Sequence, residues 1–129
     1  MQVVLDSWAV LRYLEDIDPA ATAVARLLEE GRPIVSWINV GEVYYVIHRR
    51  HGEGEAVGTV RDLQAVTDME VPDVDRVLEA AKIKADHPMS YADAFAAATA
   101  ITNNATLWTG DPELMIPSAS WRWHDLREP

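Results

Sequence analysis

The chain of 129 residues contains no cysteine. Disulfide bonds and thiolate metal sites are therefore excluded, and the composition suits a reducing compartment such as the cytosol. The longest nearly uninterrupted apolar runs are far shorter than the roughly 20 residues that a helix needs to span a bilayer. No basic-then-apolar signal segment opens the chain. We therefore expect a cytoplasmic protein that does not enter a membrane.

Basic residues are scarce. Eleven Lys and Arg stand against 21 Asp and Glu, and the formal net charge is −10. Because nucleic-acid binding draws mainly on Lys and Arg, the charge alone argues against a nucleic-acid partner. The bases are clustered, however, in "HRRH" (48–51) and at Lys82 and Lys84. An acidic protein can also hold a phosphodiester when metal ions bridge the two anions.

The chain has no internal repeat, low-complexity run or linker, and we expect one domain over residues 1–129. Short apolar runs predict strands at 2–5, 33–37, 69–72 and 105–110, with an edge strand at 121–126. Helical patterns lie between them: one follows the first strand, with Trp8, Leu11 and Leu14 at a spacing of three, and the others cover 16–31, 39–52, 53–66, 73–87 and 90–101. This alternation predicts an α/β fold with a mostly parallel central sheet of four to five strands and helices on both faces.

Two helices carry clear end signals. In the helix predicted over 16–31, Asp18 is expected as the N-cap, Pro19 as the first helical residue and Gly31 as the stop. Asp73 is expected to cap the helix over 73–87.

Four acidic residues are predicted at one edge of the sheet. Asp6 directly follows the first strand, and Asp111 follows the fourth. Glu42 lies near the start of the helix after the second strand, and Asp93 near the start of the helix that leads into the fourth. Because ligands of such folds bind at the carboxyl ends of the strands, these side chains are candidates for one site.

Each acid also has a purely structural interpretation. Asp6 can cap the first helix, and "DPE" (111–113) is typical of a helix start. Ser90 and Asp93 fit a capping box. Glu42 can be a solvated surface residue.

The four acids together are harder to explain by structural roles than each acid is alone. Neither Glu42 nor Asp93 has a Lys or Arg three or four residues away, so neither has an ion-pair partner on its own helix. Four unpaired carboxylates at one edge would repel one another, and a bound cation removes the repulsion. Ligation by oxygen alone suits Mg²⁺ or Mn²⁺, and the pattern is compatible with one ion or with two.

Four segments of the chain resemble the motifs of PIN-domain nucleases, in particular the VapC-type toxins of bacterial and archaeal toxin–antitoxin pairs. The segments are "VVLDS" (3–7), "GEVYYV" (41–46), "SYADAFAAATA" (90–100) and "LWTGDPEL" (107–114). The resemblance runs from residue 3 to about residue 115. It implies a three-layer PIN-like fold, in which the acidic residues of the family correspond to Asp6, Glu42, Asp93 and Asp111.

The resemblance also extends to neighbouring polar residues. The helper hydroxyls and amides of the family correspond to Ser7, Ser36, Asn39 and Thr109. Trp8 stands where many members have a small residue, which bears on the shape of the pocket mouth and not on the acids.

The implied activity is metal-dependent hydrolysis of an RNA phosphodiester, with Mg²⁺ or Mn²⁺ as cofactor. Asp6, Asp93 and Asp111 would anchor the metal, and Glu42 would complete its shell or orient the attacking water. The resemblance further implies a VapB-type antitoxin, whose Arg- or Lys-bearing tail occupies the site, and a homodimer. The segment "VYYVI" (43–47) is a candidate contact, although core packing also explains such a stripe.

Two other hypotheses remain at this point. One is a non-catalytic PIN-like module that binds RNA or protein. The other is a phosphoacceptor receiver domain, which the sequence disfavours because Asp6 stands alone after the first strand and no Lys lies beyond Lys84. Four basic residues either contact RNA or form solvated helix surface: Arg49, Arg50, Lys82 and Lys84.

Overall fold

The computed structural model describes residues 2–129. The strands are β1 (Val3–Leu5), β2 (Ile34–Ser36), β3 (Asp68–Glu70), β4 (Thr106–Thr109) and β5 (Arg122–Asp125). The helices are α1 (Ser7–Leu14), α2 (Ala20–Glu30), α3 (Trp37–His51), α4 (Glu53–Val66), α5 (Val74–Asp86) and α6 (Tyr91–Thr102). No helix within residues 2–129 has both the length and the apolar character needed to cross a membrane.

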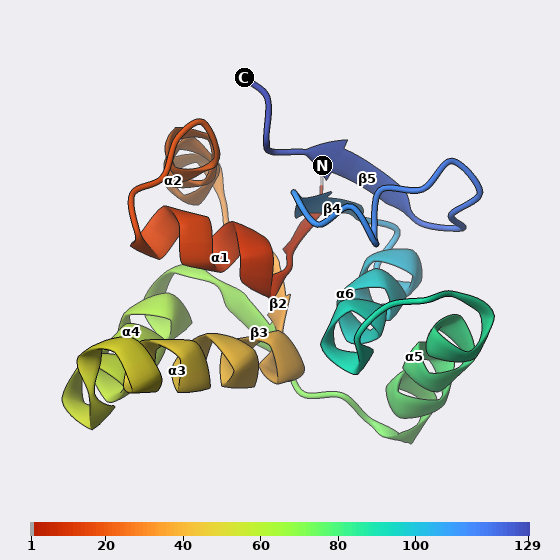
Figure 1. The fold of residues 1–129 in the computed structure, drawn as a ribbon, viewed down its shortest axis with the longest axis horizontal. Helices are drawn as coiled ribbons and strands as arrows, with labels where there is room; N and C mark the ends of the chain where they lie inside the picture. Colours follow the sequence, from red (N-terminus) through yellow and green to blue (C-terminus); the bar gives the residue numbers. More distant parts are fainter. Residues whose placement is uncertain (1) are drawn as a thin grey trace.

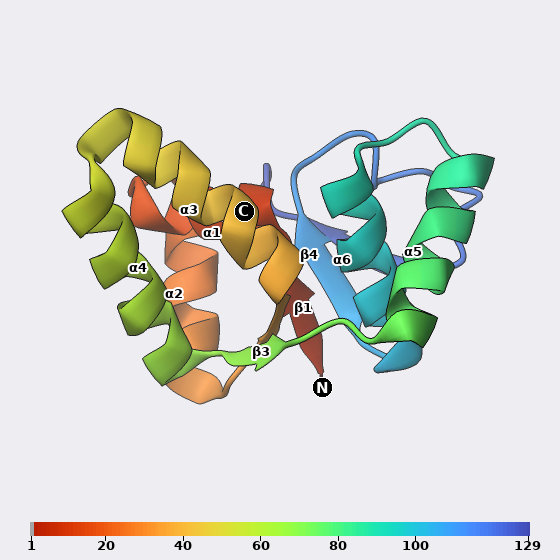
Figure 2. The same cartoon turned by 90° about the horizontal axis from the view of Figure 1, so that it is seen from below.

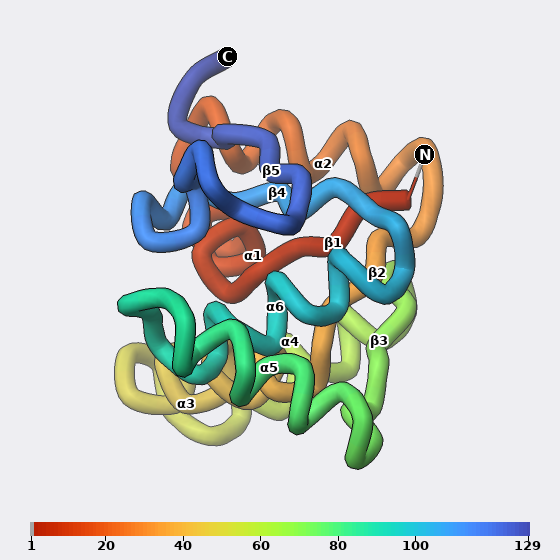
Figure 3. The backbone as a smooth tube through the Cα atoms, turned by 90° about the vertical axis from the view of Figure 1, so that its right-hand side faces the viewer, coloured from red at the N-terminus to blue at the C-terminus, as the bar shows by residue number. Residues whose placement is uncertain are grey.

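The five strands form one sheet in the order β3-β2-β1-β4-β5, and every pairing is parallel. Figure 3 shows the strands following one another across the molecule in this order. Val4 of β1 lies between Ile34 of β2 and Leu107 of β4. The predicted α/β fold with a mostly parallel sheet is thus confirmed, and the edge strand β5 is parallel as well.

Helices cover both faces of the sheet, so the molecule has three layers (Figures 1 and 2). Successive side chains of a strand point to opposite faces, and β1 therefore feeds two cores. Val4 packs into the core beneath α5 and α6. Val3 and Leu5 pack into the core formed with α1, α2, α3 and α4.

Helix α6 lies in the core because its side chains are small. Its residues from Asp93 to Ala100 are all buried, and most of them are alanine. Small side chains let the helix backbone approach the sheet closely at normal packing density. This close approach brings the first turn of α6, which carries Asp93, to the sheet edge.

Helix α2 begins one residue later than predicted. Pro19 occupies the cap position instead of the first helical turn. Asp18 still serves the helix start, because its Oδ1 accepts hydrogen bonds from the backbone N–H of Thr22 at 3.0 Å and from the Thr22 hydroxyl at 2.6 Å. Asp73, by contrast, caps α5 as predicted, accepting from the N–H of Arg76 at 2.9 Å.

The helix-start interpretation of "DPE" (111–113) is wrong. The backbone there closes two successive turns, with the N–H of Leu114 donating to Asp111 and that of Met115 donating to Pro112. Pro117 follows at once, and its fixed φ and missing N–H prevent the turns from continuing as a helix.

Candidate active site

Two neighbouring strands bring two carboxylates to one edge of the sheet. β1 and β4 are parallel partners, so Asp6 after β1 and Asp111 after β4 emerge on the same side. Thr109 at the end of β4 joins them. Its hydroxyl donates to the Asp6 carboxylate and accepts from the backbone N–H of Asp111 at 3.0 Å. A single side chain therefore holds the positions of both acids.

An open groove of about 320 Å³ lies at this edge. Three of the four predicted acids line it: Glu42 from α3, Asp93 from α6 and Asp111 from the turn after β4. The full lining consists of Ser7, Trp8, Leu11, Glu42, Val46, Ser90, Asp93, Asp111 and Glu113. Residues far apart in the sequence thus form one acidic surface.

Asp6 is fully buried and lies behind this lining. Its Oδ1 caps α1 by accepting from the N–H of Ala9 at 2.8 Å, and its Oδ2 accepts from Thr109. Burial raises the pKa of Asp6 to about 7, against the two hydrogen bonds, and the charges of Asp111 and Glu42 raise it further. The interpretation of Asp6 as a helix cap is thus confirmed, whereas its role as a metal ligand stays a prediction.

Asp93 is buried at the start of α6. Its backbone N–H donates to the Ser90 hydroxyl at 3.1 Å, which is half of a capping box. Within residues 2–129 no return bond joins the Asp93 carboxylate to the Ser90 N–H, so the carboxylate serves the groove instead. Burial raises the pKa of Asp93 to about 8, reinforced by the adjacent Asp111 side chain and then by the charges of Asp6 and Glu42.

Glu113 joins the cluster, and the sequence interpretation missed it. Asp93, Asp111 and Glu113 each place one carboxylate oxygen within 4.8 Å of the other two. The N–H of Glu113 also donates to Asp111 Oδ1 at 3.0 Å, which fixes the Asp111 side chain. The available signal was the position of Glu113 two residues after Asp111, which the helix-start interpretation of "DPE" left unused.

Glu42 has no cationic partner among residues 2–129, as its helix spacing predicted. Its Oε2 accepts only a long hydrogen bond, 3.4 Å, from the Tyr45 hydroxyl. The carboxylate is therefore free to turn toward Asp93 and Asp111 across the groove.

Asn39 connects the elements that carry these acids. Its side-chain amide donates to the Ser7 hydroxyl on α1 at 3.2 Å and to the Ala92 carbonyl at the start of α6 at 3.1 Å. Its Oδ1 is buried and accepts no hydrogen bond within residues 2–129. Ser36, the fourth predicted helper, caps α3 through the N–H of Ile38 at 3.2 Å and contacts none of the acids by a hydrogen bond in this part of the chain.

The predicted basic residues lie in two separate places. Arg49 and Arg50 lie at the end of α3, where Arg49 stacks on Tyr45 at 5.0 Å and Arg50 pairs with Glu15. Lys82 and Lys84 lie on α5, which packs on the far side of α6 (Figure 2). One surface does not hold all four.

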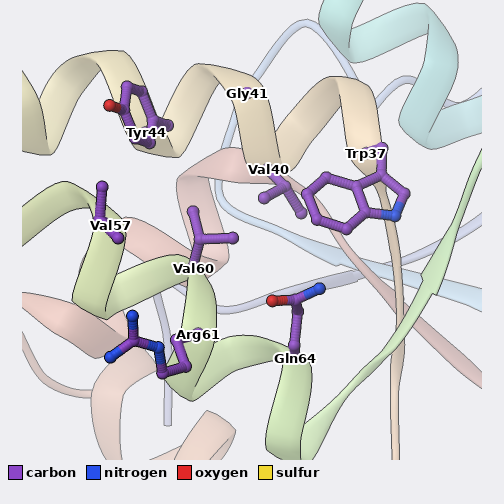
Figure 4. A pocket seen from close by; sticks show the side chains of 8 residues that line it. All are labelled: Trp37, Val40, Gly41, Tyr44, Val57, Val60, Arg61 and Gln64. Carbon is purple, nitrogen blue, oxygen red and sulfur yellow. The ribbon is translucent and has the colours of Figure 1, made fainter.

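A second cavity, of about 390 Å³, separates α3 from α4. Figure 4 shows its mainly apolar walls, with Trp37 and Tyr44 on α3 facing Val57 and Val60 on α4. The nearby segment 43–47 is mostly core: Val43 and Ile47 are buried, and Tyr45 is the most exposed member.

The acidic groove fits a hard divalent cation. All its candidate donors are oxygens, the ligands that Mg²⁺ and Mn²⁺ prefer. Asp93, Asp111 and Glu113 could each supply one carboxylate oxygen to such an ion, because these three oxygens lie within 4.8 Å of one another. Burial, and to a smaller extent the charges of neighbouring carboxylates, raise the pKa values of Asp6 and Asp93, and a bound cation would favour their ionised forms.

Comparisons with known proteins agree with this fold. The fold is similar to VapC20 of Mycobacterium tuberculosis, a sarcin–ricin loop cleaving toxin, with 18% identity, a TM-score of 0.76 and coverage of 93% of this chain and 96% of that one. It is also similar to VapBC-1 from nontypeable Haemophilus influenzae, with 21% identity, a TM-score of 0.75 and coverage of 99% and 100%. VapBC2 of Rickettsia felis, bound to a fragment of its promoter DNA, matches at 16% identity with a TM-score of 0.75 over 97% and 98%.

These solved structures share the fold at low sequence identity. A sequence search among curated proteins returned no significant match. The family model of the PIN domain matches residues 3–115, which include every acid of the groove. The chain therefore belongs to the PIN domain family.

Proposed function

We propose that this protein is a metal-dependent endoribonuclease and the toxin of a type II toxin–antitoxin pair, and that residues 1–129 form one PIN-like domain. The observation that carries the proposal is the convergence of Asp93, Asp111 and Glu113 at the carboxyl edge of a parallel sheet. Within residues 2–129 no Lys or Arg forms an ion pair with any of the three. A structural role would not require this arrangement, because unpaired acids destabilise one another.

The residues of the acidic groove have different roles in the proposed reaction. Asp93, Asp111 and Glu113 would hold Mg²⁺ or Mn²⁺, with Glu42 completing the shell or orienting the attacking water. The bound cation lowers the pKa of its water and stabilises charge that develops on the phosphate. Asp6 and Thr109 keep Asp111 in position through their shared hydrogen bonds.

The negative charge of the groove also supports a protein partner that carries a cationic side chain. Similar structures include VapBC complexes from Haemophilus influenzae and Rickettsia felis. We extend this to a VapB-type antitoxin whose Arg or Lys side chain enters the acidic groove of this chain, and to a homodimer of the toxin. A cationic side chain would offset the same repulsion that the metal offsets.

The substitution Asp93→Asn tests the proposal. The amide leaves the backbone bond to Ser90 in place but removes the charge that binds the cation. We expect the variant to lose most Mn²⁺ binding in isothermal titration at pH 8.5 and at least about 100-fold of its RNA cleavage rate, as for other losses of transition-state charge stabilisation. Asp86→Asn, at the exposed end of α5, is the matched control.

Two outcomes count against the proposal. If wild type binds no Mn²⁺, or if Asp93→Asn cleaves RNA as fast as wild type, the catalytic assignment is wrong. If wild type binds Mn²⁺ but cleaves none of total cellular RNA, the non-catalytic binding module replaces the ribonuclease.

A further inference from the structure

Three adjoining cavities run between α1 and α3, which lie side by side in Figure 1. The first is the acidic groove. The second, about 160 Å³, shares Trp8 and Leu11 with it. The third, about 820 Å³, shares Glu15 and Arg50 with the second and extends to the C-terminal turn of α3. We call this row of cavities the α1–α3 track.

Arg12 lies in the middle of the track and is held there by an aromatic ring. Its guanidinium stacks over the Trp8 indole, 4.7 Å from the ring centroid. Within residues 2–129 it forms no ion pair, although the chain is strongly acidic. An indole orients a guanidinium without neutralising it, so the charge stays available to a ligand.

The indole itself is fixed by Gly110. A Cβ at that position would come within 2.2 Å of Trp8 Cζ2, so the ring packs directly on bare backbone next to Asp111. The Arg12 guanidinium is therefore held next to Trp8, whose side chain also lines the acidic groove. Trp8 is a positioning residue in this arrangement.

Arg50 supplies a second guanidinium farther along the track. It pairs with Glu15, and the side chains of Arg50 and Glu15 are 54% and 29% exposed to solvent. Exposed ion pairs of this kind contribute little stability, so a competing anion can replace Glu15. Beyond it, the third cavity is lined by His51 and Glu55 among others.

We infer that the α1–α3 track binds the RNA strand next to the cleavage point, with Arg12 and Arg50 contacting backbone phosphates. This inference rests on the proposed function, because it takes the acidic groove as the place of the scissile phosphate. Such a strand would need a cation between its phosphate and the acids, and guanidinium contacts beside them. The acids, Arg12 and Arg50 follow one another along the track in this order. Arg12 and Arg50 favour an anionic ligand along the track, whereas the acids favour a cation in the groove.

The test is the salt dependence of RNA binding. The probe is a fluorescein-labelled, mixed-sequence single-stranded RNA of about 20 nucleotides, a length that allows several phosphate contacts. Its anisotropy is measured with Ca²⁺ in place of Mg²⁺ to limit cleavage. Each lost phosphate contact should lower the slope of log affinity against log salt by about 0.7. We expect this decrease in slope for Arg12→Ala and for Arg50→Ala, and a decrease about twice as large for the double variant.

Two comparisons separate charge from structural damage. Arg26→Ala, an exposed arginine of α2 that lines none of the three cavities, should leave affinity and slope unchanged. Arg12→Lys keeps the charge and should keep the slope, whereas a merely structural role would make both Arg12 variants alike.

The failures are distinguishable. If wild type binds Mn²⁺ and cleaves RNA, but Arg12→Ala and Arg50→Ala behave like Arg26→Ala, the track is wrong and the proposed function stands. If the variants keep RNA binding but lose affinity for a protein partner, the track is a protein site and the inference is overturned. Absence of Mn²⁺ binding and cleavage by wild type defeats the proposed function itself.

Discussion

Thr109 and Gly110 show how much of the site depends on single residues at the end of β4. Thr109 joins two carboxylates through one hydroxyl. Gly110 gives the Trp8 indole the space it occupies. Trp8 stands where many proteins of the family that the sequence resembles have a small residue. Its bulky indole fits because Gly110 has no Cβ.

We predict that Gly110→Ala destabilises the protein by about 1–3 kcal/mol, the usual cost of overpacking. The reason is the 2.2 Å approach of the new Cβ to Trp8 Cζ2. Urea unfolding measures the effect. Combining Gly110→Ala with Trp8→Leu should cost less than the sum of the two single changes, because the smaller side chain removes the clash. Strictly additive costs would show that the indole is not what Gly110 accommodates.

At the scale of the element, the start of α6 sets the direction of Asp93. Ser90 accepts the Asp93 N–H, so the first turn of the helix is held while the carboxylate remains free. The alanine-rich face behind it brings this turn close to the sheet. A well-formed helix start and a place in the acid cluster are therefore compatible roles for one residue.

We predict that Ser90→Ala lowers the free energy of unfolding by about 1 kcal/mol through loss of the N-cap. Ser90→Thr retains a capping hydroxyl and should cost less. Denaturant midpoints measure both, and Mn²⁺ titration shows whether a looser first turn also weakens metal binding. Equal stability of the alanine variant and wild type would mean that the cap contributes nothing to α6.

At the scale of the whole molecule, the acid cluster couples stability to pH. Asp6 and Asp93 have folded-state pKa values raised from 3.8 to about 7 and about 8. Between the unfolded and folded values the folded protein keeps protons that the unfolded chain releases. The contribution of these groups is therefore complete below about pH 4 and is lost as pH rises through 7 to 8.

We predict that the metal-free protein loses stability between pH 5 and 8.5, by up to about 1.4 kcal/mol per pH unit for each group. Mn²⁺ should restore stability most at the upper end, because it binds the deprotonated form. Melting temperatures measured across this range in EDTA and in Mn²⁺ test the sign. Asp93→Asn should flatten the metal-free profile, and a profile as steep as that of wild type would contradict the assignment.

Much of this architecture could be predicted from the sequence. The alternation of apolar runs with helical patterns predicted the parallel sheet, and the strand ends placed Asp6 and Asp111 at one edge. These features are local or follow from general rules of α/β topology. The start of α2 at Ala20 was missed by one residue, because helix ends depend on hydrogen bonds that a sequence pattern does not resolve.

Glu113 shows where sequence reasoning failed. "DPE" is a common helix start, and only the chain's course toward Pro117 turns it into a pair of tight turns that bring Glu113 to the groove. That Arg12 forms no ion pair within residues 2–129 was equally beyond prediction, because ion pairing depends on residues from other elements.

The sequence by itself determined the fold class and the acids at the strand ends, since periodicity and strand polarity are properties of the chain. Only the tertiary structure decided which acids share the groove, that Asp6 lies buried behind it and that Arg12 and Arg50 line the cavities beside it, because distance and burial arise from packing between elements.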